Sequence, residues 1–134
     1  MDKYFNGFSV VVGAVGGTLA GLMGGWDLLL KIMILMILLD YFTGILKSVY
    51  TKSLSSEIGY KGIIKKVMIL IIVTVAYAVQ RIINTSIPVR EIVITFFLAN
   101  ECISITENAA VCGLPLPKKL TELLIQLRGE GELK

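Results

Sequence analysis

Histidine is absent from the 134 residues of this chain, and cysteine and proline are scarce, with two and three copies. The absence of histidine removes the commonest metal ligand and the usual general base at neutral pH. No residue spacing suggests a metal site, and no glycine-rich loop carries the lysine that a phosphate-binding loop needs. We therefore expect no catalytic residue, no cofactor and no metal, and the chain is not expected to be an enzyme.

The two cysteines, Cys102 and Cys112, fall in one predicted helix. Ten helical residues span about 15 Å, which is too far for a disulfide. We interpret both side chains as small apolar fillers. The net charge is +3, but the lysines cluster beside apolar runs, so nucleic-acid binding is not expected.

Long uncharged runs dominate the chain, which is 55% hydrophobic with a mean hydropathy of +0.80. A soluble domain of this size would expose too much apolar surface, so we predict one membrane-embedded domain over residues 1–134. The N-terminal stretch lacks the features of a cleavable signal peptide. The predicted fold is all-α, with four transmembrane helices at about 8–26, 28–46, 63–83 and 89–112. A short amphipathic helix at about 117–128 follows. Three spans are the alternative, because Glu101 and Glu107 weaken the fourth.

Basic residues set the expected orientation. Most of them gather between the second and third predicted spans, where only Glu57 opposes them. By the positive-inside rule this loop is cytoplasmic, and four spans then place both termini of the multi-pass chain inside. The basic residues of this loop are Lys47, Lys52, Lys61, Lys65 and Lys66.

Glycines gather on one face of the first predicted span. They recur at four-residue steps, at Gly13, Gly17, Gly21 and Gly25. Small residues at this spacing let two helix backbones approach closely in a membrane. Two interpretations stay open: packing against the second span, with which the first would form an antiparallel hairpin, or self-association between subunits.

Asp40 interrupts the apolar second span, where a carboxylate costs about 2.5–3.5 kcal/mol on insertion scales. Thr43 and Lys47 share its face. A second polar stripe on the fourth span is expected to face the bundle interior or an aqueous lumen, or else to lie in the headgroups. Asp40 either locks the helices together or lines an opening, and the nearby cytoplasmic end favours the lock. The second stripe contains Asn100, Glu101, Ser104, Glu107 and Asn108.

Three blocks of sequence resemble the toxin-secretion/phage-lysis holin family, whose members include small membrane proteins of phages that infect Gram-positive bacteria. The first block is Leu39–Gly44 followed by Lys47, and the second is Gly59–Lys66. The third runs from Ala99 through Glu107-Asn108 to Leu120. Together they cover about residues 32–127, with the order and spacing of the family.

The resemblance implies a protein that forms homo-oligomers in the cytoplasmic membrane and opens lesions at a set time. Such lesions release a phage endolysin, without direct contact between the two proteins, and collapse the membrane potential, so that the host lyses. Its partners would be other copies of itself and membrane lipids. A small proton-coupled transporter, an antiholin that delays lysis and a non-lytic membrane scaffold are the alternatives.

Overall fold

The computed structural model describes residues 2–131, with side chains described for residues 6–127. Residues 1 and 132–134 of the predicted domain lie outside the described part. Five helices follow one another: α1 (Asp2–Leu22), α2 (Leu28–Tyr50), α3 (Ser56–Ile82), α4 (Val89–Val111) and α5 (Lys118–Gly131). The described residues form no strand, which confirms the predicted all-α class.

Local sequence explains where the helices begin and end. Asp27 caps α2 by accepting a 2.9 Å hydrogen bond from the Leu30 amide, and Ser55 caps α3 by accepting one of 3.2 Å from Ile58. Such side-chain caps satisfy amide groups that have no partner within the helix. Gly113, at φ +93°, follows the end of α4, as is typical of a helix C-terminus.

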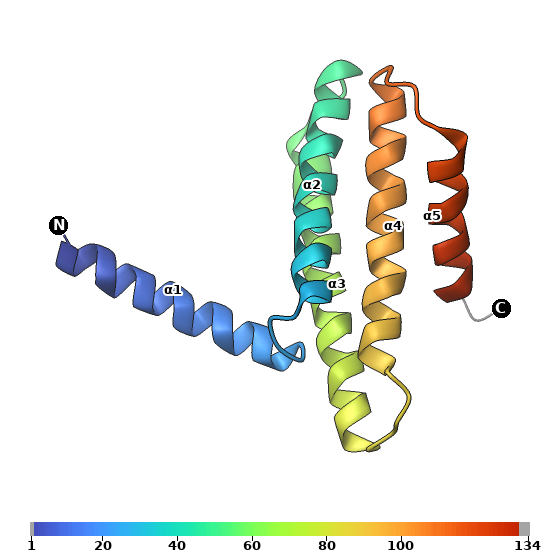
Figure 1. Ribbon diagram of the computed structural model, residues 1–134. Coiled ribbons are helices and arrows are strands. Elements are labelled where there is room, and N and C mark those ends of the chain that lie inside the picture. The colour runs from blue at the N-terminus through green and yellow to red at the C-terminus, as the bar shows by residue number, and fades with distance from the viewer. Residues whose placement is uncertain (1, 132–134) are drawn as a thin grey trace.

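Three helices, α2, α3 and α4, form the bundle, and α5 packs along the outer side of α4 (Figure 1). The apolar core lies between the bundle helices and includes Leu30, Met33, Val73 and Ile94, all fully or almost fully buried. Large apolar side chains also cover much of the outer surface of α2 and α3, which suits contact with lipid rather than water.

Two helices, α2 and α3, are long and apolar enough to cross a membrane among the residues described. The apolar part of α1, Asn6–Leu22, is shorter. Helix α4 has 23 residues, but it contains four charged ones, at Arg90, Glu91, Glu101 and Glu107. The predicted count of four spans is therefore not confirmed, although a helix stands close to each predicted span.

The predicted hairpin of the first two spans is wrong. Helix α1 ends at Leu22, leads away from the bundle and does not run along α2 (Figure 1). Only its last turn reaches the core, through Ala20, which is 1% exposed. Two successive glycines with positive φ, Gly24 at +96° and Gly25 at +101°, turn the chain after α1 in a way that few other residues allow.

The predicted amphipathic helix is present as α5. We expected it either on the inner membrane face or against a partner helix, and α4 of the same chain is that partner. Helix α5 returns antiparallel to α4 after the turn that contains Pro115 and Pro117 (Figure 1). Much of its apolar stripe still faces outward, since Leu120, Leu123 and Leu127 are all more than two-fifths exposed.

Candidate functional site

A buried ionic triad joins the three bundle helices. The Lys66 ammonium of α3 donates to Asp40 Oδ2 of α2 and, at 2.5 Å, to Glu101 Oε2 of α4. Asp40 is 8% exposed and Glu101 is 3% exposed. Charges this deep in a membrane-embedded bundle are tolerated when they pair with one another. One lysine therefore holds two acids that come from different helices.

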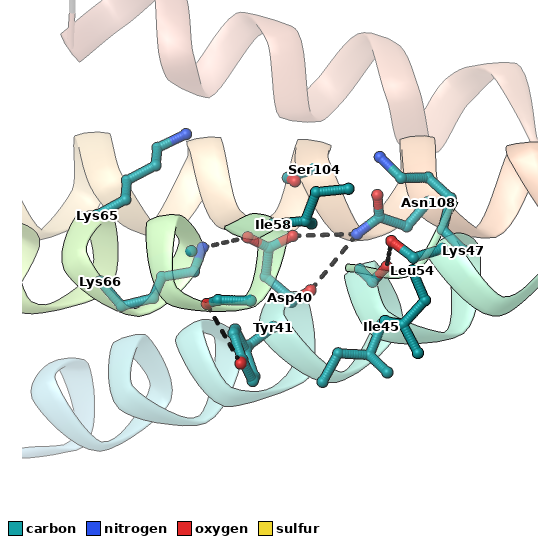
Figure 2. Close-up of a pocket in the computed structure, with 14 residues that line it drawn as sticks. Asp40, Tyr41, Ile45, Lys47, Leu54, Ile58, Lys65, Lys66, Ser104 and Asn108 are labelled. Carbon is teal, nitrogen blue, oxygen red and sulfur yellow. Dashed lines mark hydrogen bonds and ion pairs between the residues drawn. The ribbon is translucent and has the colours of Figure 1, made fainter. Parts of the chain in front are cut away.

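Neutral side chains complete the hydrogen bonding around Asp40. The Asn108 amide of α4 donates to Asp40 Oδ1 at 3.2 Å and to Thr43 Oγ1 at 3.0 Å. The Thr43 hydroxyl donates in turn to the Asp40 carbonyl at 3.1 Å. Figure 2 shows Asp40 between Lys66 on one side and Asn108 on the other. Asp40 thus ties α2 to both α3 and α4.

Two pockets flank the triad. The first, of about 220 Å³, lies between the ends of α2, α3 and α4 and is lined by Asp40, Lys47, Lys65 and Ser104 among others (Figure 2). The second, of about 450 Å³, lies between α3 and α4 and is lined by Asn100, Glu101 and Glu107, with Asp40, Lys65 and Ser104 again. Both are large enough to hold water next to polar partners.

The helices α2 and α3 approach closely beside the first pocket. The Tyr41 hydroxyl donates to the Gly59 carbonyl at 3.4 Å (Figure 2). A Cβ at Gly62 would lie 3.2 Å from the Tyr41 ring. Both glycines belong to the second sequence block, so that block supplies the surface on which the Asp40-Tyr41 segment rests.

The structure separates the predicted polar stripe of α4 into two groups. Glu101 and Asn108 are buried and bond to α2 or α3, while Asn100 and Ser104 are half-buried. Glu107 is exposed at the edge of the second pocket. Only part of the stripe therefore enters the bonded network around Asp40.

The predicted cytoplasmic loop is shorter than expected. It consists of residues 51–55 and carries only Lys52, because α3 begins at Ser56. Lys47 lies in the last turn of α2, and Lys61 pairs with Glu57 at 2.8 Å on the exposed surface of α3. Lys65 is exposed on α3 as well. Lys66 was wrongly assigned to the loop, since it is the buried cation of the triad.

The predicted glycine face lies on α1 and has no neighbour within the described part of the chain. A Cβ added at Gly13, Gly17 or Gly21 would meet nothing within 4 Å. Packing of this face against the second span is therefore wrong. Gly25 does not belong to the face, because it lies in the turn after α1 with φ +101°.

A second polar centre was missed from the sequence. Arg90 of α4 is 2% exposed and forms hydrogen bonds with the turn between α1 and α2. Its guanidinium donates to the Met23 carbonyl, to the Gly25 carbonyl at 3.3 Å, and to both carboxylate oxygens of Asp27 at 2.7 and 3.0 Å. The bond from Arg90 holds the pKa of the Asp27 carboxyl below its usual value.

These features define a class: a small helical membrane protein whose bundle is joined by buried charges rather than by an apolar core alone. No metal-ligand cluster is found among the residues described, and the buried charges bond to one another. Within this class, the model of the bacteriophage holin family matches residues 17–129, and the chain belongs to that family. The resemblance drawn from the three sequence blocks is thereby confirmed.

Individual relatives extend over most of the chain. An uncharacterized protein of Listeria innocua is 43% identical over 110 residues, which cover 82% of this chain and 79% of that protein. An uncharacterized 14.9 kDa protein of Clostridium perfringens is 36% identical over 131 residues, 97% of this chain and 99% of that one. A probable holin of Bacillus phage phi105 is 30% identical over 105 residues, 78% of each. No solved structure matches the chain significantly.

Proposed function

We propose that this chain is a holin: copies associate in the cytoplasmic membrane of a bacterium and open lesions that release an endolysin and collapse the membrane potential. The observation that carries the proposal is the match to the holin family over residues 17–129. The similarity to a probable phage holin over 78% of the chain supports it.

The position of α1 supports association between copies. Its exposed surface combines an open glycine face with large apolar side chains such as Val12, Val15 and Leu19. In a membrane, close backbone approach along such a face favours helix–helix contact. Since α1 does not use this face within the described part of its own chain, a second copy is the partner that we propose.

The topology that we propose keeps four crossings, with residues 51–55 and both termini in the cytoplasm. The lysine distribution supports this orientation. Helix α1 would then cross beside a neighbouring subunit instead of along α2. Accessibility of single cysteines at residues 6 and 120 to an impermeant thiol reagent, in a background without Cys102 and Cys112, tests this topology. Labelling of residue 6 from outside intact cells would contradict it.

Expression of the chain tests the proposed function. Induced alone, it is expected to stop growth and depolarise the membrane abruptly; with a cytoplasmic muralytic enzyme, it should also lyse the cells. Continued growth with an intact membrane potential would refute the proposal. Delayed lysis on co-expression with a functional holin would instead identify an antiholin, and altered survival under drug challenge without depolarisation would identify a transporter.

The glycine face has its own test. Gly17→Leu and Gly21→Leu should delay or abolish lysis, because a large side chain keeps two helix backbones apart. Val15→Leu, on the same helix but at an apolar position, is the matched control and should lyse on time. Unchanged timing in both glycine variants, at equal expression, would remove this face from the mechanism.

A further inference from the structure

The charges of the triad do not balance. Asp40 and Glu101 carry two negative charges when both are ionised, and Lys66 supplies one positive charge. All three side chains are at least 87% buried, with exposed fractions of 10%, 4% and 13%. An uncompensated charge in such a site is costly, and a buried carboxyl usually avoids it by binding a proton.

The geometry favours a single proton shared within the triad. Because Asp40 and Glu101 both bond to the same Lys66 nitrogen atom, the two carboxyl groups lie close to each other. Two carboxyl groups at this distance cannot both ionise easily, so one of them keeps a proton. A protonated carboxyl can donate to the other, which turns the repulsion between them into a hydrogen bond.

The other charged groups near the triad do not remove the imbalance. Lys65 and Lys47 line the first pocket, and Lys65 and Glu107 line the second. None of these three makes an ion pair with the triad in the described part of the chain, and Lys65 and Glu107 are exposed to solvent. Helix α5 contributes no described residue to either pocket.

We propose that the triad of Asp40, Lys66 and Glu101 holds one proton while α2, α3 and α4 are packed, so that packing of the bundle is coupled to pH. The packed bundle then binds one proton more than a state in which the helices have parted and both carboxyls face water. By linkage, a lower pH favours packing and a higher pH favours separation. The two pockets let water and protons reach the triad without unfolding.

The proton itself can be measured by infrared spectroscopy of the purified full chain in phospholipid vesicles. A protonated carboxyl has a carbonyl band that an ionised carboxylate lacks. We expect this band at pH 7 in the natural chain and its loss as the pH rises. Its absence from the natural chain at pH 7 would overturn the proposal, whatever the variants do.

Single substitutions assign the band. Glu101→Gln and Asp40→Asn should each abolish it, because the remaining carboxylate then balances Lys66. Glu107→Gln is the matched control on α4, and Glu91→Gln tests the one carboxyl oxygen that is buried without a hydrogen-bond partner in the described structure. Both controls should keep the band. A band that persists in Glu101→Gln or Asp40→Asn would overturn the proposal.

Unfolding in mixed micelles tests the coupling to pH. One linked proton corresponds to a change in the unfolding equilibrium constant of up to about tenfold per pH unit. We expect this slope in the natural chain from about pH 5, where carboxyls in water have already ionised, up to the pH at which the infrared band is lost. We expect no such slope in Glu101→Gln. Lys65→Met, next to Lys66 but exposed, should keep it. Equal slopes in the natural chain and Glu101→Gln would refute the coupling. This experiment does not depend on lysis, so it can fail while the proposed holin function stands.

Discussion

Arg90 is predicted to contribute more to stability than any exposed arginine of this chain. Its side chain reaches from the start of α4 to the turn between α1 and α2, where it binds two main-chain carbonyl groups and the Asp27 carboxylate. Replacement by Met in Arg90→Met keeps much of the apolar stem and removes every one of these hydrogen bonds. The turn then loses its attachment to α4.

The magnitude follows from the surroundings of each lost bond. Asp27 has a side chain that is 48% exposed, so water can replace Arg90 there, and its ion pair is worth only about 1 kcal/mol or less. The Met23 carbonyl loses a buried charged donor, and a hydrogen bond to a charged group is worth about 1.5–3 kcal/mol. The bond to the Gly25 carbonyl is part-buried and longer, at 3.3 Å, and adds little. We therefore expect Arg90→Met to lower the free energy of unfolding by about 2–4 kcal/mol.

Equilibrium unfolding of the purified chain in mixed micelles measures this loss. Arg81→Met is the matched control, because Arg81 is exposed at the end of α3, and such a surface change should stay within about 0.5 kcal/mol. Arg90→Lys should fall between the two, since an ammonium cannot bind the carboxylate and the carbonyls together as a guanidinium does. Equal losses of unfolding free energy in Arg90→Met and Arg81→Met would refute the conclusion that Arg90 stabilises the turn between α1 and α2.

Three further predictions concern the turn and the Asp40 network. Gly24→Ala should destabilise the chain clearly more than Gly25→Ala in the same unfolding assay, because both residues have positive φ but only a Cβ at Gly24 would overlap the Arg90 guanidinium. Because Arg90 lowers the pKa of Asp27, the Asp27 carboxylate stabilises the fold above its unfolded pKa of about 3.8, and this stabilisation is lost as the pH falls through the folded pKa. Asp27→Asn should therefore flatten the loss of stability at acid pH. An unchanged dependence of stability on pH would contradict the role of the Asp27–Arg90 pair. Asn108→Ala should cost about 1–3 kcal/mol, because it leaves the buried Asp40 short of a donor; a loss below about 0.5 kcal/mol, as for a surface residue, would count against the network.

Much of the helical framework follows from the sequence alone. The second predicted span, 28–46, falls inside α2, and the fourth, 89–112, lies within one residue of α4. Their limits are set by strong local signals: the Asp27 cap at one end of α2, and Pro88 and Gly113 around α4. Apolar runs of this length leave the chain few alternatives to a helix.

The direction of α1 could not be predicted in the same way. It depends on two successive glycines with positive φ, Gly24 and Gly25, whose backbone angles no sequence pattern specifies. It also depends on Arg90, which is 63 residues away from Asp27 in the chain. A topological argument could have suggested this pair, since Asp27 and Arg90 both belong to the predicted outer end of the bundle.

The triad shows a second limit of reasoning from charge counts. Lys66 was counted with the loop lysines because the positive-inside rule considers numbers of charges, not helix faces. Its spacing was informative, however, since Lys66 stands three, seven and ten residues before Ile69, Val73 and Ala76, the buried residues of α3. A lysine on the buried face of an apolar helix indicates an acidic partner on a neighbouring helix.

The distribution of polar and apolar residues has a consequence for mutational tolerance. The bundle buries five polar or charged side chains, at Asp40, Ser48, Arg90, Glu101 and Asn108, while most of its large apolar residues face outward. In a water-soluble domain, polar surface positions accept substitution and the apolar interior resists it. In this chain the tolerance to substitution is reversed. Exchanges among Val, Ile and Leu on the outer surface should change stability little, whereas the few polar positions of the interior specify which helices pair and should resist substitution.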